Sequence, residues 1–228
     1  MLNFKNTLII CILILTVLSC KKSSTNSEPK VITFPDSNFE LLIREVLEIP
    51  TGDILDTNLE ALIYLDGSTR NITDITGIEY CINLDTLRIT NNQIEDISML
   101  AGLDGLIFLS IGTNPITDIR ILSNLINLKR LHMGHIQATD FSTIASLTLL
   151  EIFGVAGNNL IDIGFLKDLQ NLKTLYLSTN LITDIKPLID NQGIGSDDYV
   201  RLRNNPLSVS SINTYIPELE SRGVTIDY

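Results

Sequence analysis

The sequence has no tryptophan, and aromatic residues account for only 6% of its 228 positions. A large core must therefore consist of aliphatic side chains, which are abundant because 44% of the residues are hydrophobic. Only two histidines and three cysteines are present, so a structural zinc site with four ligands would require nearly all of them. Charged residues make up 19%, too few for a disordered chain, and the length suits one domain with a sizeable core.

Positive charge is scarce as well. The chain carries 16 Lys and Arg against 27 Asp and Glu, which gives a net charge of −11. A nucleic-acid-binding protein needs a basic face to contact phosphates, and docking on anionic lipid headgroups needs one too. We therefore expect no nucleic-acid partner and no electrostatic binding to a membrane surface.

The N-terminus contains an apolar run that is too short to span a bilayer. Lys5 precedes the run Leu8–Leu18, which has about 11 residues where a membrane-spanning helix needs about 20. The run ends in Val17-Leu18-Ser19-Cys20, which resembles the lipobox of bacterial lipoproteins. The resemblance implies cleavage before Cys20, lipidation of Cys20, and a location in the bacterial cell envelope, at the outer membrane or the cell surface. An ordinary secretory signal that happens to contain a cysteine is the alternative.

A period of 22 residues organises the rest of the chain. Leucines recur at this spacing from Leu84 to Leu172, and several other positions repeat with them. An aspartate recurs in every repeat from Asp74 to Asp184, and an asparagine recurs from Asn92 to Asn180 with Ile136 as the exception. Five good repeats and two degenerate flanking repeats result, with an insertion in the stretch 191–198.

The spacing within a repeat predicts its local structure. Leu84, Leu87 and Ile89 alternate in the manner of a short strand, and strands from successive repeats stack in parallel. The recurring asparagine can satisfy backbone groups of its own and the neighbouring turn, and the recurring aspartate can cap a helical turn on the return side. Because 22 residues leave no room for a full α-helix, the return side should consist of 3₁₀ turns or extended chain.

No repeat of this kind is stable alone, so the stack needs caps at both ends. Pro35-Asp36-Ser37 predicts the start of an amphipathic helix before the repeats, and a helix followed by a terminal strand is expected after them. With Cys20 lipidated, Cys81 has no partner for a disulfide. The predicted segments are a lipoprotein signal peptide (1–19), a flexible tether (20–30), an N-terminal cap (31–58), the repeats (59–207) and a C-terminal cap (208–228).

These residues resemble the leucine-rich repeat family, in particular its 22-residue, internalin-like bacterial class. The resemblance implies an α/β fold: a right-handed solenoid with a concave parallel β-sheet, a convex side of 3₁₀ or extended segments, and helical caps. It also implies a binding module and not an enzyme. The chain departs from the pattern at Ile136, at Arg70 and in the insertion at 191–198.

The remaining motifs give little support to catalysis or cofactor binding. The recurring aspartates stand alone in their repeats, which favours caps over calcium ligands. Whether the insertion between Asp190 and Asp198 binds calcium is left open. His132 and His135 lie in one repeat but lack a third ligand, and no nucleophile–base set stands out. We therefore expect no enzymatic activity, no cofactor and no metal.

The exposed positions of the strands are the candidate ligand site. They are rich in aromatic residues and arginine, the types enriched at protein interfaces. We expect a monomer that binds a protein partner, with two alternatives: a surface adhesin or glycan-binding lipoprotein, and an envelope scaffold that acts through its convex side or caps. The ligand's identity, and whether the protein faces the periplasm or the exterior, are left open. The predicted ligand-binding residues are Tyr64, Arg88, Phe108, Arg130, His132, Tyr176, Tyr199, Arg201 and Arg203.

Overall fold

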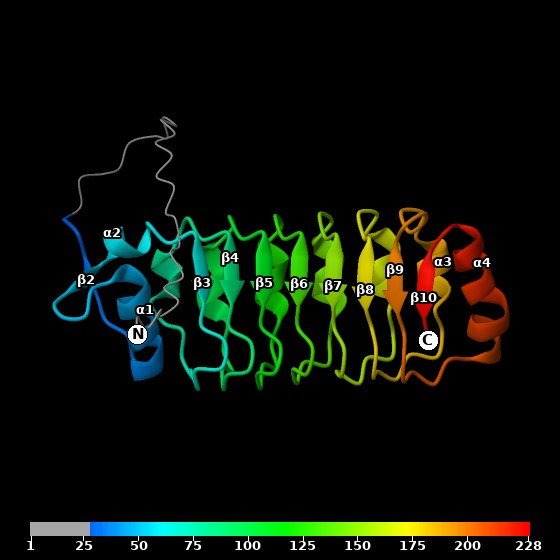
Figure 1. Ribbon diagram of the computed structural model, residues 1–228, viewed down its shortest axis with the longest axis horizontal. Helices are drawn as coiled ribbons and strands as arrows, with labels where there is room; N and C mark the ends of the chain where they lie inside the picture. The colour runs from blue at the N-terminus through cyan, green and yellow to red at the C-terminus, as the bar shows by residue number, and fades with distance from the viewer. Residues whose placement is uncertain (1–27) are drawn as a thin grey trace, which may run out of the picture.

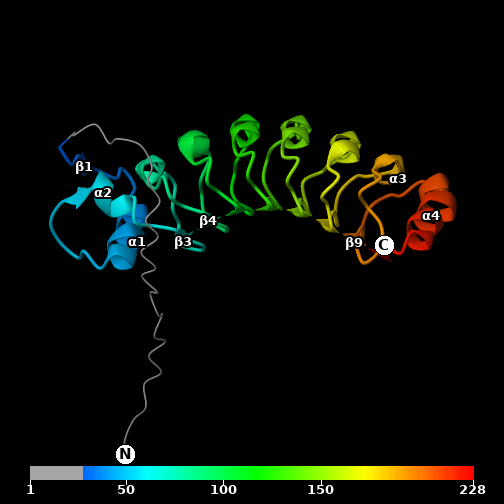
Figure 2. The same ribbon diagram turned by 90° about the horizontal axis from the view of Figure 1, so that it is seen from above.

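The computed structural model describes residues 28–228. The predicted signal peptide, Cys20 and most of the predicted tether lie outside the described residues. Within residues 28–228, no helix is long and apolar enough to cross a membrane. The described chain forms a shallow arc in which short strands line the inner side and helical turns line the outer side (Figures 1 and 2).

The N-terminal part packs a helix against the first repeat. Asp36 caps this helix, because one carboxylate oxygen accepts the Asn38 N–H at 2.8 Å and the Phe39 N–H at 2.9 Å. Its other oxygen accepts the N–H of Thr73 at 2.7 Å, so the same carboxylate joins the helix to the repeats. The helix buries Phe39, Leu42 and Ile43 in the common core. The elements here are β1 (Val31–Ile32), α1 (Ser37–Leu47), β2 (Ile54–Leu55), which pairs antiparallel with β1, and α2 (Asp56–Leu59).

An eight-stranded parallel sheet forms the inner side of the arc. Leu65 pairs with Leu87, and Leu87 with Leu109, so the 22-residue spacing of the sequence is also the register of the sheet. The middle residue of each repeat strand is buried and its two neighbours face the concave side, as the alternation predicted. The strands are β3 (Tyr64–Asp66), β4 (Thr86–Arg88), β5 (Phe108–Ser110), β6 (Arg130–His132), β7 (Ile152–Gly154), β8 (Thr174–Tyr176), β9 (Tyr199–Arg201) and β10 (Thr225–Asp227).

The convex side consists mainly of 3₁₀ helices, which confirms the prediction made from repeat length. The recurring aspartates hold the turn that leads into each of them: Oδ1 of Asp96, for example, accepts the N–H of Ser98 at 2.7 Å. The same contact occurs in all six repeats that carry the aspartate. The helices are η1 (Ile78–Tyr80), η2 (Ser98–Gly102), η3 (Arg120–Asn124), η4 (Ser142–Ser146), η5 (Gly164–Asp168) and α3 (Lys186–Asp190), which is α-helical.

The recurring asparagines form a buried ladder. The amide of Asn92 donates to the carbonyls of Gly67 and Ile89, both at 2.9 Å, and its oxygen accepts the N–H groups of Arg70 and Ile72, both at 3.0 Å. Asn114, Asn158, Asn180 and Asn205 repeat these contacts in part or in full. The ladder holds neighbouring turns together and confirms the role predicted for this position.

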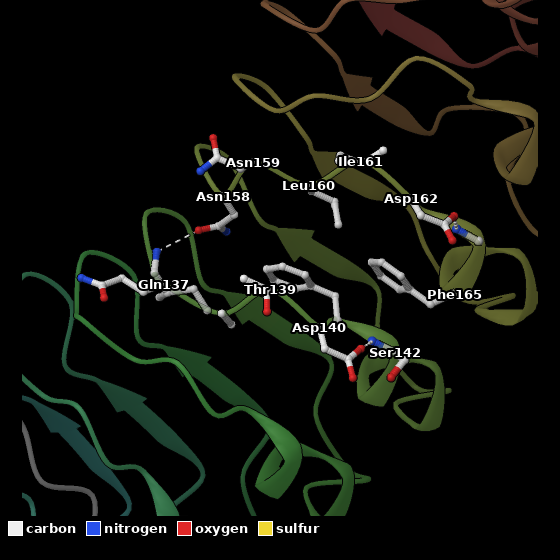
Figure 3. Close-up of a pocket in the computed structure, with 14 residues that line it drawn as sticks. Gln137, Thr139, Asp140, Ser142, Asn158, Asn159, Leu160, Ile161, Asp162 and Phe165 are labelled. Atoms are coloured by element: carbon white, nitrogen blue, oxygen red, sulfur yellow. Dashed lines mark hydrogen bonds between the residues drawn. The ribbon is translucent and has the colours of Figure 1, made fainter.

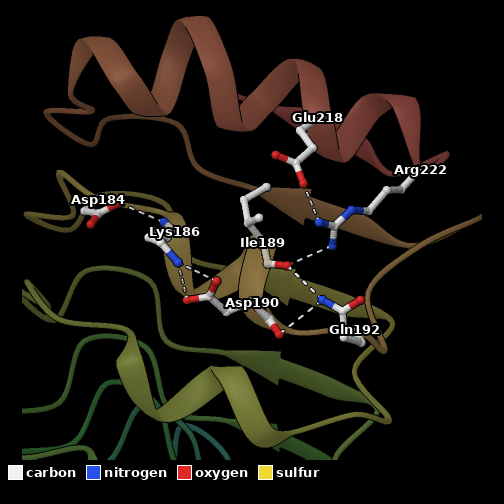
Figure 4. Close-up of polar contacts among 7 residues, drawn as sticks. All are labelled: Asp184, Lys186, Ile189, Asp190, Gln192, Glu218 and Arg222. Carbon is white, nitrogen blue, oxygen red and sulfur yellow. Dashed lines mark hydrogen bonds and ion pairs between the residues drawn. The ribbon is translucent and has the colours of Figure 1, made fainter.

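The C-terminal part covers the last repeat. A π-helical turn, η6 (Ser211–Tyr215), runs into α4 (Ile216–Ser221), and β10 then closes the sheet beside β9. Arg222 joins α4 to α3, because its guanidinium donates to the Ile189 carbonyl at 2.9 Å and pairs with Glu218 at 2.6 Å (Figure 4). Lys186 and Asp190 pair within α3. These contacts fix the end of the arc.

Candidate functional site

The structure places all nine predicted ligand-binding residues on or beside the concave sheet. Tyr64 lies on β3, Arg88 on β4, and the others follow along the sheet as far as Arg203, just beyond β9. Their side chains lie on either side of the buried middle residue of each strand. They are not equally accessible: the four arginines and Tyr64 are exposed, whereas His132, Tyr176 and Tyr199 are half-buried.

Phe108 was expected to offer an exposed ring on the concave face, but its ring is covered. Its side chain is only 8% exposed. Two arginines from neighbouring strands lie over its ring, with guanidinium carbons 4.8 Å (Arg88) and 4.9 Å (Arg130) from the ring centroid. These are cation–π distances, and the long side chains shield the ring from water. Phe108 therefore positions two guanidinium groups instead of offering a stacking platform itself.

Starting with Phe108, four rings follow one another along the sheet. We call Phe108, His132, Tyr176 and Tyr199 the concave row. Neighbouring centroids are 5.6, 6.2 and 6.2 Å apart. His132 reaches Tyr176 across β7 because β7 carries Gly154 there. A Cβ on Gly154 would lie 2.8 Å from Nδ1 of His132. The glycine thus makes the row continuous over five strands.

Burial, followed by the nearby charges of Arg88 and Arg130, lowers the pKa of His132 below its ordinary value of 6.5. His132 is therefore mainly neutral at pH 7. The centre of the concave face consequently holds two fixed positive charges and one imidazole that gains a proton only in more acidic solution.

The C-terminal end of the face is built differently. Asp227 of β10 pairs with Arg201 at 3.1 Å and with Arg203, and it accepts the Tyr199 hydroxyl at 3.3 Å. Sequence reasoning missed Asp227 because it belongs to the cap and lies outside the 22-residue pattern. One carboxylate therefore pairs with both predicted cations at this end and offsets one of their two charges.

At the other end, Tyr64 stands apart from the concave row. Its hydroxyl donates to Asp66 at 3.3 Å, and Asp66 also accepts the N–H of Ser68 at 3.0 Å. Burial and then the charge of Asp66 raise the pKa of Tyr64. Asp66, a second acidic residue that the predicted site did not include, makes this end of the face less positive than its centre.

A groove of about 520 Å³ lies away from the concave face, between the turns of the third and fourth good repeats (Figure 3). It forms where Ala138 occupies a position that carries Ile94, Ile116 or Leu160 in other repeats. Phe165 lines it, and the ring of this residue stacks on Phe141 at 6.5 Å. Asp140 and Asp162 also line it, but each already caps a turn. Sequence reasoning did not identify this groove, although the short side chain at position 138 was visible in the repeat alignment.

Exposed aliphatic side chains mark one edge of the arc, in the segments that lead from the convex turns into the strands. We call this set the aliphatic edge. A backbone ladder joins neighbouring segments, as where the Asp85 N–H donates to the Ile63 carbonyl and the Ile107 N–H donates to the Asp85 carbonyl. The aliphatic edge consists of Ile63, Ile82, Ile107, Ile126 and Leu149.

Metal binding finds no support in the described part of the chain. Within residues 28–228, no group of three or more His, Cys, Asp or Glu residues is placed to hold a metal ion. In the insertion, Asp190 pairs with Lys186, and the Asp198 carboxylate accepts the N–H of Gly195 at 2.8 Å. His132 lies on the concave face, whereas His135 lies in the following turn beside Gly157.

Comparison with known proteins identifies the fold. The family "Leucine Rich repeats (2 copies)" matches residues 148–190. An internalin of Listeria monocytogenes (InlF) superimposes with a TM-score of 0.68 at 28% identity, covering 85% of this chain and 63% of that one. Internalin C2 of the same organism gives 0.66 at 25% identity, covering 90% of this chain and 100% of that one. A leucine-rich repeat protein of Leptospira interrogans gives 0.59 at 21% identity over 75% of this chain and 50% of that one. No curated protein matches the sequence.

Proposed function

We propose that this protein, a leucine-rich repeat solenoid of the internalin-like type, is a non-catalytic module that binds another protein on its concave face. The concave row carries the proposal: four rings in contact, with Arg88 and Arg130 over the first of them, run across β5 to β9. Aromatic residues and arginine contribute most of the binding energy at protein interfaces. The internalins with which it shares its fold support a binding role over an enzymatic one.

The scaffold suits this role because it orders the surface before any partner arrives. The parallel sheet and the buried asparagine ladder tie each strand to the next. Binding therefore requires little ordering of the backbone, which lowers the entropic cost of association. The strands place their concave-side residues at a fixed spacing, so a partner meets a surface that is already arranged.

We further propose that the protein works at the bacterial cell envelope, anchored through a lipid on Cys20. The support is the lipobox-like end of the N-terminal apolar run and the polar composition of residues 21–30. An anchored solenoid held by such a tether remains free to orient its concave face toward a partner on the same or a facing surface.

The proposal is tested by crosslinking the full chain on intact cells and identifying the crosslinked proteins by mass spectrometry. Arg130→Ala with Tyr176→Ala removes two side chains from the centre of the face and should weaken binding by at least about 2 kcal/mol, the range of interface hot spots. Arg120→Ala with Lys167→Ala, a matched pair of exposed residues on the convex side, should leave the crosslinked partner unchanged.

Two other outcomes identify the alternatives. Binding to a glycan array, with loss on Tyr176→Ala or Tyr199→Ala and no protein crosslink, would support the glycan-binding alternative. This reading is weakened by Phe108, which the arginines cover. Loss of the crosslink on Arg120→Ala with Lys167→Ala, but not on changes to the concave face, would place the site on the convex side and support the scaffold alternative.

A further inference from the structure

Arg88 and Arg130 differ from every other arginine of the protein. The sequence has eight arginines, and all lie among the described residues. Six of them form an ion pair with a carboxylate: Arg44, Arg70, Arg120, Arg201, Arg203 and Arg222. Within residues 28–228, Arg88 and Arg130 have no carboxylate within 4.0 Å, although the chain carries 27 acidic residues.

The same two arginines lie over one ring. Both guanidinium carbons are within 4.9 Å of the Phe108 centroid, so two like charges flank one ring. Asp66 attracts Arg88, and Glu151 attracts Arg130, only from beyond ion-pair distance. A partner that brings negative charge adds a closer counter-ion and offsets the repulsion between the two guanidinium groups. The guanidinium groups keep donors free for a carboxylate, which they bind in a planar, two-pronged geometry.

We propose that Arg88 and Arg130 form the anchor for an acidic peptide segment of the partner protein, which seats an Asp or Glu carboxylate over Phe108 and an apolar side chain on the concave row. This rests on the proposed function and specifies the chemistry of its partner. The anchor spans β4 to β6, where the concave row begins, and the half-buried rings of His132 and Tyr176 provide the adjoining apolar surface.

The surroundings of His132 predict that binding is linked to a proton. The charged groups facing it are Arg88 on β4 and Arg130 on β6, and both lower its pKa together with burial. The facing position of β7 is Gly154 and that of β8 is Tyr176. A carboxylate seated on the arginines offsets their charge and raises the pKa of His132. The bound complex therefore takes up a proton, and binding strengthens as the pH falls from the raised pKa of the bound form toward the lowered pKa of the free form.

The experiment uses a phage library of random dodecapeptides, panned on the full chain. Enriched peptides are synthesised together with versions in which Gln or Asn replaces each Glu or Asp, and their affinities are measured by fluorescence anisotropy. We expect enriched peptides to contain Asp or Glu beside an apolar residue. Their amide versions should bind about tenfold more weakly or worse, as expected when a charge loses its partner. Acidic peptides should also bind more tightly at pH 5.5 than at pH 7.5, and His132→Gln should remove that difference.

Matched variants distinguish binding by this anchor from nonspecific attraction to the positive charge of the face. Arg88→Gln with Arg130→Gln should weaken binding as much as the amide peptides do, and Arg88→Lys with Arg130→Lys should restore part of it. Arg201→Gln with Arg203→Gln removes the same charge from the same face, but from arginines that Asp227 already pairs, and should have little effect. Thermal denaturation checks that each variant is folded.

The inference is overturned if panning enriches no acidic peptides, if the two glutamine pairs weaken binding equally, or if polygalacturonate binds while the peptides do not. The inference can fail while the proposed function holds. If a protein crosslink survives Arg88→Gln with Arg130→Gln but is lost on Tyr176→Ala, the partner binds the concave face without the acidic anchor.

Discussion

Replacing Asn158 by alanine interrupts the asparagine ladder next to Ile136, where the neighbouring repeat already lacks the asparagine. The Asn158 oxygen accepts the Ile136 N–H at 2.8 Å, and its amide donates to the Met133 carbonyl at 2.8 Å and the Val155 carbonyl at 3.1 Å. In the variant, the Val155 carbonyl still accepts a hydrogen bond from the amide of Asn180. The Met133 carbonyl loses its side-chain donor, because position 136, where the pattern would place a second asparagine, carries Ile136. The change therefore leaves one buried N–H and one buried carbonyl without partners.

Each unsatisfied buried group costs about 1–3 kcal/mol, so with two such groups Asn158→Ala should lower the free energy of unfolding by about 2–6 kcal/mol. The assay is urea denaturation followed by circular dichroism. Gln137→Ala is the control, since Gln137 is exposed in the neighbouring turn, and it should stay within about 0.5 kcal/mol of the wild type. An Asn158→Ala protein as stable as the control would show that these hydrogen bonds do not hold the repeats together.

Four further predictions follow from individual residues. Ile136→Asn restores the ladder and should leave the free energy of unfolding unchanged or raise it by up to about 1 kcal/mol in the same urea assay. A clearly lower free energy of unfolding would show that an asparagine at position 136 does not join the ladder. Gly154→Ala should displace the His132 ring, expose it, and raise its pKa toward 6.5 in an NMR titration; an unmoved titration would show that the ring does not depend on the glycine. Burial raises the pKa of Asp36, but its hydrogen bonds from Thr73 and the helix N-terminus outweigh burial and hold it below 3.8. The stabilisation by Asp36 should therefore be complete above about pH 4 and lost as the pH falls through the lowered pKa, so the stability difference from Asp36→Asn should shrink in acid. Cys20→Ala should abolish labelling by a fatty-acid analogue and partitioning into detergent; a variant that still labels would disprove the anchor.

Much of the fold could be predicted because the repeat leaves few alternatives. A strict 22-residue spacing fixes which residues of neighbouring strands pair, as with Leu87 and Leu109. Asn92 and Asp96 are the residue types whose side chains satisfy backbone groups in a turn and at a helix start, so their positions marked both features in advance. A further signal was present but unused: Asn83, Asn127 and Asn171 recur 44 residues apart, and each donates to a carbonyl of the preceding turn.

The candidate site was less predictable because it depends on contacts between repeats and with a cap. The alternation of Phe108 with buried residues placed it on the concave face. The ring is covered because the side chains of Arg88 and Arg130 lie over it, and the sequence does not show these conformations. Asp227 pairs with Arg201 and Arg203 from a strand outside the repeat pattern. The sequence marked both arginines as candidate site residues but did not show that one carboxylate already holds them.

Hydroxyl-radical footprinting of the protein with its crosslinked partner tests the central claim most directly. Radicals oxidise accessible aromatic, histidine and aliphatic side chains, so a partner on the concave face should protect His132, Tyr176 and Tyr199. Phe165, in the groove outside the concave face, and Ile126, on the aliphatic edge, should be oxidised as in the free protein. Protection confined to Ile126 or Phe165, with the concave row oxidised as before, would contradict the claim that this face binds the partner.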